Sequence, residues 1–281
     1  MGQSTSHRSE QRQALRAQVH DHRRPDDPLE PPEPAHAAQD PIQADPEIAA
    51  KTGESPLWTA ARQGKTERLD LLIRAKADVN EATYDGRTPV YTAAYENNAD
   101  CLTLLLHAKA DMDKADNDGV TPVFVAAQKK NKVCLDTLLG AKANVDKATN
   151  DGTSPVYIAA QNNNADCLKS LLRARAHVDR ATNTGTTPVY VAAENDCADC
   201  LELVIFARAD VDKADSDGTT AVWMAAQDNS VACLDLLLRA KADIQKTWGG
   251  KSPLEVARHE GHTACVELLE SAEAGVGGQQ G

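Results

Sequence analysis

The sequence contains no apolar run close to the roughly 20 residues that a membrane-spanning helix requires, and no signal-peptide-like apolar core near its start. Aromatic residues make up only 4% of the 281 residues, and 42 Asp and Glu outnumber 30 Lys and Arg, for a net charge of −12. Phosphate neutralisation supplies most affinity for nucleic acids, so an acidic chain without a basic patch in its folded part is not expected to bind them. We expect a cytoplasmic protein, attached to a membrane only by something other than a span.

Catalytic motifs are missing as well: the sequence has no phosphate-binding loop, G-x-S-x-G motif or kinase signature. Cys197 and Cys200 form a C-x-x-C pair, but a zinc site needs two further ligands and a redox motif needs a βαβ context. His259 and His262 stand one residue too close together for the metalloprotease helix motif. We therefore predict that the chain is not an enzyme and holds no cofactor or metal.

What the sequence does contain is a repeat. One glycine recurs every 33 residues, and one more follows after 32, at Gly53, Gly86, Gly119, Gly152, Gly185, Gly218 and Gly250. A fixed period of this length predicts stacked supersecondary units rather than one globular core.

The local signals inside one repeat agree with each other. Thr88 is a suitable N-cap for a first helix, with Pro89 at its first position. The Asn97–Asn98 pair should end that helix, because Asn tolerates the left-handed conformation of a tight turn. A second helix with apolar residues at helical spacing follows between Cys101 and Ala108, and residues 116–119 form a turn before the next Thr-Pro pair.

These residues bring a family resemblance into view. The frame D-x-x-G-x-T-P-x-x-x-A-A, followed by L-L-x-A-x-A-D-V-D, resembles the ankyrin repeat, and seven copies cover about four-fifths of the chain. The resemblance implies an all-α solenoid in which each repeat contributes two antiparallel helices and a projecting β-turn. It also implies an interaction module or adaptor that binds a partner protein through its concave face and turn tips. The alternative is a non-catalytic, substrate-recruiting subunit of an enzyme complex.

The chain divides into four segments. Residues 1–24 are basic and carry a candidate myristoylation signal, and residues 25–52 form a Pro-rich acidic linker that cannot bury enough apolar surface to fold. Residues 53–271 hold the seven repeats, and residues 272–281 form a Gly-rich tail that we expect to be flexible. The polar residues Arg68 and Glu255, at otherwise apolar repeat positions, indicate capping repeats.

Aromatic residues recur at one position of the repeat, as Trp58, Tyr91, Phe124, Tyr157, Tyr190 and Trp223. We interpret them as packing residues of the stack; the alternative is a stacking platform for a partner. Another position holds Cys101, Cys134, Cys167, Cys200, Cys233 and Cys265, which we expect to be buried free thiols in a reducing compartment.

Two positions of the repeat are basic. Lys76, Lys109, Lys142, Arg175, Arg208 and Lys241 should lie at the ends of the second helices, where cations interact favourably with exposed carbonyls. We interpret Lys114, Lys147, Arg180 and Lys213, each one residue after an Asp, as solvated ion ladders.

The resemblance places partner-binding residues at the turn tips and on the inner face. They are Tyr84, Asp85, Arg87, Tyr95, Glu96, Asn117, Asp118, Val120, Gln128, Lys129, Asn150, Asp151, Gln161 and Asn162. Tyr and Arg are typical hot-spot residues, which favours the N-terminal end with Tyr84, Arg87 and Tyr95. Residues 53–281 carry 33 acidic against 24 basic side chains, so we expect the partner segment to be basic or of mixed charge. We expect the protein itself to be a monomer.

The first six residues match M-G-x-x-x-[ST], the acceptor pattern for N-myristoylation at Gly2. One myristoyl chain gives only marginal membrane binding, and Arg8, Arg12 and Arg16 could supply the second, electrostatic signal. The motif predicts reversible peripheral contact with a membrane. The rival interpretation is a disordered tail whose arginines bind nothing.

Overall fold

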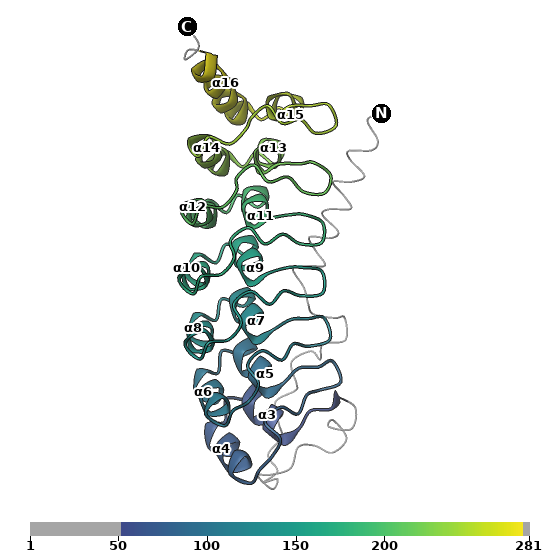
Figure 1. The fold of residues 1–281 in the computed structure, drawn as a ribbon, viewed down its shortest axis with the longest axis vertical. Coiled ribbons are helices and arrows are strands. Elements are labelled where there is room, and N and C mark those ends of the chain that lie inside the picture. The colour runs from purple at the N-terminus through teal and green to yellow at the C-terminus, as the bar shows by residue number, and fades with distance from the viewer. Residues whose placement is uncertain (1–51, 278–281) are drawn as a thin grey trace, which may run out of the picture. The chain divides into compact units, whose positions relative to one another are not determined.

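The computed structural model describes residues 52–277, and within them fourteen α-helices follow one another in seven pairs (Figure 1). The first helices of the pairs are α3 (Pro56–Arg62), α5 (Pro89–Tyr95), α7 (Pro122–Gln128), α9 (Pro155–Gln161), α11 (Pro188–Glu194), α13 (Ala221–Gln227) and α15 (Pro253–Glu260). The second helices are α4 (Thr66–Arg74), α6 (Ala99–His107), α8 (Lys132–Gly140), α10 (Ala165–Arg173), α12 (Ala198–Phe206), α14 (Val231–Arg239) and α16 (Thr263–Gly277). The predicted all-α solenoid of seven repeats is confirmed.

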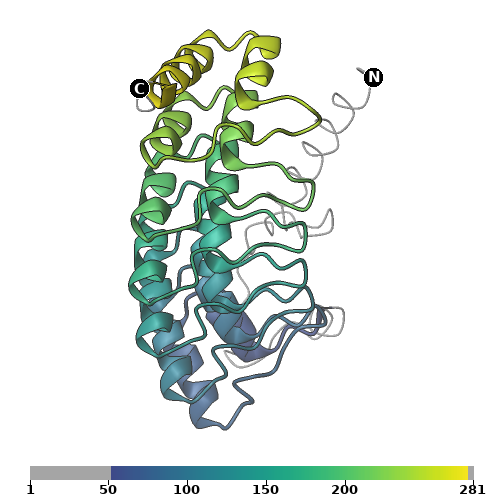
Figure 2. The same ribbon diagram turned by 45° about the horizontal axis from the view of Figure 1, so that its top comes forward.

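The repeats stack in a regular order. Each first helix packs on the first helices of the neighbouring repeats, and the second helices form a parallel layer of the same kind. The turns between repeats project from the first-helix layer, on the side opposite the second helices (Figures 1 and 2). The array therefore presents a continuous surface made of turn tips and first helices.

The first helices begin as the sequence predicts. The hydroxyl of Thr88 accepts a hydrogen bond from the backbone N–H of Tyr91 at 3.1 Å, and Pro89 occupies the first helical position. The sixth repeat has Ala221 in place of Pro, yet the hydroxyl of Thr220 still accepts from the N–H of Trp223, at 3.4 Å. The N-cap is thus sufficient to start the helix without the proline.

Both helices of a repeat end in a left-handed residue. Asn97 ends the first helix of the second repeat with φ 59°, as predicted. Lys109 ends the second helix with φ 64°; its N–H donates to Leu106 O, and the N–H of Ala110 donates to Leu105 O. This hydrogen-bond pattern is the Schellman motif, in which glycine is the usual left-handed residue. The first basic column therefore occupies a position of backbone strain.

The aromatic and cysteine columns lie inside the stack. All six aromatic side chains are buried, which confirms packing rather than a platform for a partner. All seven cysteines are buried and free, and the thiols of Cys134 and Cys200 lie 3.8 and 3.9 Å from the carbonyl oxygens of Ala93 and Ala159 in the preceding repeat.

The second basic column does not form the expected ion ladder. Lys147 Nζ donates to the backbone carbonyl of Asp113 at 2.7 Å, and the Asp113 carboxylate accepts from the backbone N–H of Asn144 at 2.7 Å. Lys114, Lys213 and Lys246 donate to carbonyls of the preceding repeat in the same way. For Lys114, Lys147 and Lys213 the prediction was wrong, because these side chains reach a backbone carbonyl of the neighbouring repeat. They join repeats together through side chain to backbone hydrogen bonds.

A third set of inter-repeat hydrogen bonds was not expected. The side-chain amide of Asn131 donates to the carbonyls of Ala94 and Tyr95, both at 2.8 Å. Asn98 and Asn164 make the equivalent contacts with the first helices of the first and third repeats. Each asparagine thus donates to carbonyls at the C-terminal end of the preceding first helix, where helix carbonyls lack their full set of partners within the helix.

The two end repeats differ from expectation in detail. Nε and Nη2 of Arg68 are shielded from solvent without a hydrogen-bond partner, so this side chain does not simply present a polar face to water. Ser252 and Glu255 form a reciprocal capping box at the start of α15, which accounts for Glu255 at an otherwise aromatic position.

The boundary predicted at residue 271 falls inside α16, because Ala272, Glu273 and Ala274 favour helix before the glycines begin.

The predicted segments 1–24 and most of 25–52, together with Gly2, lie outside the described residues. None of the helices in residues 52–277 combines the length and the apolarity needed to cross a membrane.

Burial protects the thiols chemically. It raises the pKa of Cys134 to about 11 and that of Cys200 to about 12, and the thiolate is the reactive form. We expect the native protein to react with well under one equivalent of a thiol reagent at pH 8. The denatured protein should react at all seven cysteines. Rapid labelling of Cys134 or Cys200 in the native state, located by peptide mass spectrometry, would contradict this prediction.

The strained lysines offer a second test. Lys142 has φ 71°, a conformation that costs a residue with a side chain about 1 kcal/mol more than glycine. Replacing Lys142 with glycine removes this cost, but part of the stabilisation is lost because glycine is more flexible in the unfolded chain. We expect Lys142→Gly to raise the free energy of unfolding by a few tenths to about 1 kcal/mol. Lys169→Gly, inside α10, should lower it by about 1 kcal/mol; urea denaturation measures both.

Candidate partner-binding surface

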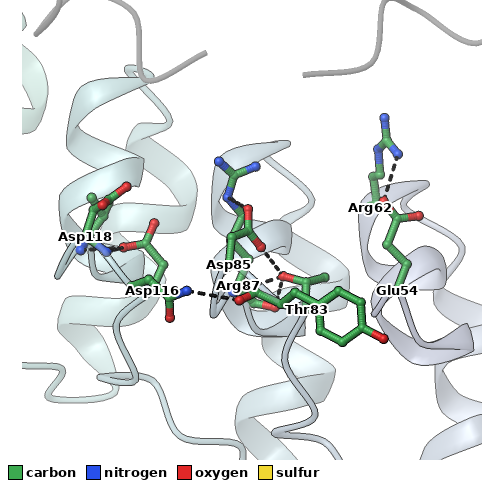
Figure 3. Close-up of polar contacts among 10 residues, drawn as sticks. Glu54, Arg62, Thr83, Asp85, Arg87, Asp116 and Asp118 are labelled. Carbon is green, nitrogen blue, oxygen red and sulfur yellow. Dashed lines mark hydrogen bonds and ion pairs between the residues drawn. The ribbon is translucent and has the colours of Figure 1, made fainter. Parts of the chain in front are cut away.

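The turn tip of the second repeat carries the most exposed aromatic side chain of the predicted site. Tyr84 is 70% exposed. Beside it, Arg87 Nε lies 3.1 Å from Asp85 Oδ2, and the hydroxyl of Thr83 donates to the other carboxylate oxygen (Figure 3). The ion pair holds both charged side chains against their own turn, so the tyrosine ring projects from a preorganised base.

The predicted asparagines at the tips join one turn to the next. Asn117 Nδ2 donates to Tyr84 O at 3.0 Å, and Asn150 Nδ2 donates to Asn117 O at 2.9 Å. Their backbone N–H groups donate to the carbonyls of Asp85 and Asp118 in the preceding turn. Both side chains remain exposed, but their N–H groups already donate hydrogen bonds to the preceding turn. Their first role is to align successive tips.

Carboxylates follow the line of tips. Asp116, which the sequence analysis did not single out, accepts from the backbone N–H groups of Asp118 at 3.0 Å and Val120 at 2.8 Å (Figure 3). Burial raises the pKa of Asp116 despite these hydrogen bonds. The pKa of Asp151 is lowered instead: burial acts to raise it, and hydrogen bonds from Thr149 and Thr153 outweigh that effect. These carboxylates stiffen the turns that hold the exposed residues.

A stack of rings and cations occupies the first-helix layer of the second and third repeats. Lys129 Nζ lies 4.4 Å from the centroid of the Tyr95 ring. The Tyr95 ring stacks on that of Tyr91, with centroids 6.4 Å apart and planes inclined by 15°. Arg87 Cζ lies 5.8 Å from the Tyr91 centroid on the way to the turn tip. Tyr95 and Lys129, both predicted, are therefore brought together.

Arg62 extends the same surface into the first repeat. Its guanidinium lies 5.6 Å from the Trp58 ring centroid, and its Nε lies 4.0 Å from Glu96 Oε1. Arg62 also lies 4.0 Å from Glu54, whose pKa is raised by burial although Arg62 acts to lower it (Figure 3). Sequence reasoning missed Arg62, although it stands one repeat period before Tyr95.

The C-terminal ends of the first helices, with the residues directly after them, form a strip that we call the rim. In the first six repeats it contains Arg62, Tyr95, Glu96, Gln128, Lys129, Lys130, Asn162, Glu194, Asn195, Asp196, Gln227 and Asp228. Lys130 and Asp196 were not among the predicted positions. Both are left-handed turn residues, and both are exposed. The 33-residue period predicts both: Lys130 directly follows Lys129, and Asp196 lies two periods after Lys130.

Two of the predicted residues are buried and do not contribute to the binding surface. Val120 is buried beneath its turn, and Gln161 is buried in α9. Neither offers its side chain to a partner, so the prediction does not hold for them. Asn162 stays at the rim but uses its amide to donate to Gln128 O at 3.1 Å. Within residues 52–277, no cluster of three or more His, Cys, Asp or Glu side chains could hold a metal ion.

The comparisons with known proteins agree with this architecture. The family model described as ankyrin repeats, in three copies, matches residues 35–116, 98–182, 123–215 and 190–277. Among solved structures, the crystal structure of the human ASB11 ankyrin repeat domain is similar. It has 26% sequence identity and a TM-score of 0.68, and the match covers 76% of this chain and 97% of that one. No curated protein sequence matches the chain. With a family model matching most of its length, the chain belongs to the ankyrin-repeat family, whose fold is typically a non-catalytic module for binding other proteins.

Proposed function

We propose that the protein is an adaptor that binds a partner protein with the turn tips and the rim of its first three repeats. The observation that carries this proposal is the cluster of exposed and half-buried aromatic and cationic side chains there. Tyr84 is 70% exposed, and the half-buried Tyr95 ring lies beneath Lys129. Tyr, Trp and Arg dominate interface hot spots, and the aromatic side chains among them supply contact area at a low cost in conformational entropy.

The rigidity of this surface supports the same proposal. Asn117 aligns the turn tips, and Asn131 holds the C-terminal end of the helix that bears Tyr95. A partner therefore meets side chains whose backbone positions are already set, which lowers the entropy that binding must overcome.

The test compares two triple variants of the full chain. Tyr84→Ala/Tyr95→Ala/Lys129→Ala removes the proposed hot spot, and Lys169→Ala/Phe206→Ala/Arg239→Ala is the control on the exposed second-helix face. We expect the first variant to capture its specific partner from the native cell extract at least about tenfold less efficiently, in line with the loss of a hot spot. The control variant should capture as much as the wild type.

Both variants should keep the far-ultraviolet circular dichroism of the wild type. The urea midpoint of the first should fall modestly, because the half-buried Tyr95 ring packs on Tyr91, while the protein remains folded under the capture conditions. An unchanged set of captured proteins in the first variant would place the binding surface elsewhere. Equal losses in both variants would likewise contradict the proposed location.

We also propose that a myristoyl group on Gly2 tethers the adaptor reversibly to a membrane surface. The support is the M-G-x-x-x-[ST] pattern, followed by Arg8, Arg12 and Arg16. Intact mass spectrometry of the protein from its native cell should show loss of Met1 and the mass of one added myristoyl group. A retained Met1 or an unmodified Gly2 would refute the tether and leave the adaptor proposal untouched.

A further inference from the structure

We infer that Thr184, in the turn between α10 and α11, is a phosphorylation site, where a phosphate takes the place that an aspartate side chain holds in four other turns. A protein kinase supplies the group from a nucleoside triphosphate. The Thr184 hydroxyl oxygen forms a bond to the terminal phosphorus, and the bond from that phosphorus to its bridging oxygen breaks. The hydroxyl proton and the nucleoside diphosphate are released. The inference goes beyond the proposed function and does not depend on which partner binds.

The position that Thr184 occupies is acidic elsewhere in the array. Whole periods of 33 residues separate it from Asp85, Asp118, Asp151 and Asp217. The preceding turn gives the best comparison, since residues 149–153 read Thr-Asn-Asp-Gly-Thr and residues 182–186 read Thr-Asn-Thr-Gly-Thr. Gly152 and Gly185 have φ of 84° and 81°, so the backbone is left-handed at the same place in both turns. The two turns therefore differ by one side chain, a carboxylate in the first and a hydroxyl in the second.

The carboxylate of the 149–153 turn collects three hydrogen bonds from its own turn. Asp151 accepts from the hydroxyl of Thr149, from the hydroxyl of Thr153 at 3.0 Å and from the backbone N–H of Thr153 at 3.3 Å. This turn sequence therefore offers three donors to an anion at its third position.

The same donors surround Thr184, but no anion is present. The hydroxyl oxygen of Thr182 lies 2.9 Å from that of Thr184 and 2.7 Å from that of Thr186. The Thr186 hydroxyl also makes a long contact of 3.4 Å with the Tyr157 hydroxyl. Among residues 52–277, the backbone N–H of Thr186 has no hydrogen-bond acceptor. In the equivalent turns this N–H donates to a side-chain oxygen of the same turn, at Arg87, Val120, Thr153 and Thr219.

Thr184 is also the threonine of this turn that a kinase can reach. Its side chain is exposed, whereas Thr182 and Thr186 are half-buried. Thr187, the next residue along the chain, is 1% exposed and serves as the N-cap of α11. The turn projects from the first-helix layer (Figure 1). An enzyme therefore has access to Thr184 without unfolding a helix.

The neighbouring carboxylates do not prevent a charge at this position. Asp151 lies one repeat before Thr184, and Asp215 and Asp217 lie one repeat after it. Packed helices are about 8–10 Å apart, which is close to the screening length of about 8 Å in physiological salt. Asp118 and Asp151 already occupy this position in consecutive turns. The array therefore tolerates charges at this spacing.

Phosphorylation changes the turn in two ways. A phosphate carries a charge of about −1.5 to −2 at neutral pH and has three acceptor oxygens, so the donors of Thr182 and Thr186 make charge-assisted hydrogen bonds to it. Such bonds are stronger than the contacts between neutral hydroxyls that they replace. The phosphate also adds negative charge between Asp151 and Asp217, which strengthens the attraction of these turn tips for a basic segment.

Peptide mass spectrometry of the full chain from its native cell tests the site. Cleavage after Arg180 and Arg208 gives one peptide that contains every threonine of this turn and Thr187. We expect this peptide to carry one phosphate that phosphatase removes, with fragment ions that place it on Thr184. The phosphate should be absent from the same peptide of Thr184→Ala. A wild-type peptide without phosphate, or a phosphate on one of its other threonines instead, would overturn the inference.

Urea denaturation tests whether the turn holds an anion. The phosphorylated chain should have a higher urea midpoint than the same chain after phosphatase treatment. This difference should shrink in Thr186→Val, which keeps the shape of the side chain and removes one donor. An equal midpoint with and without the phosphate in the wild type would contradict the proposed hydrogen bonds and overturn the inference.

Two reciprocal variants provide the matched control without a kinase. Thr184→Asp gives the 182–186 turn the sequence of the 149–153 turn and should raise the urea midpoint. Asp151→Thr makes the opposite exchange and should lower it. A lower midpoint for Thr184→Asp would show that the donors do not hold an anion, which would also overturn the inference. These measurements leave the first three repeats unchanged, so the inference and the proposed function succeed or fail separately.

Discussion

The array depends on one kind of contact: at the C-terminal ends of several first helices, a side chain of the next repeat donates a hydrogen bond to a backbone carbonyl. Asn98, Asn131 and Asn164 reach back to these carbonyls, and the imidazole of His262 lies 3.1 Å from the carbonyl of Ala226 at the equivalent place in the last repeat. A hydrogen bond of this kind contributes about 0.5–1.5 kcal/mol to stability. Neighbouring repeats therefore stabilise each other at these helix ends.

This kind of contact separates the residues that build the array from those that can serve a partner. The Asn amides, the buried aromatic rings, the thiols and the Lys-to-carbonyl bonds all belong to contacts between repeats. The residues left over at each period are the tip side chains and the rim. Because their backbone is fixed by the shared contacts, changing them alters what the surface binds with little effect on stability. We expect functional differences between repeats to lie at these positions.

The sequence predicts the features that depend on position in the period. Residue types that recur at the same position of each repeat predict the N-cap at Thr88, the left-handed Asn97 and the buried cysteines. What it does not predict is the partner of a polar side chain in the next repeat. Lys147 follows an aspartate in the sequence and suggests an ion pair, but its amine meets a carbonyl 34 residues earlier. Val120 has the spacing of an exposed tip residue, yet its side chain turns under the tip.

The same distinction applies to charge. A net charge of −12 describes the long-range field and favours basic segments at a distance, but screening limits that field to about 8–10 Å in physiological salt. Contact specificity is decided within that distance, by the few side chains that the stack places next to one another. Lys129 and Lys130 are exposed next to each other at the rim of the third repeat, and the Lys129 amine lies over the Tyr95 ring. The net charge of a chain therefore does not by itself fix the charge of the segment that a rigid local surface complements.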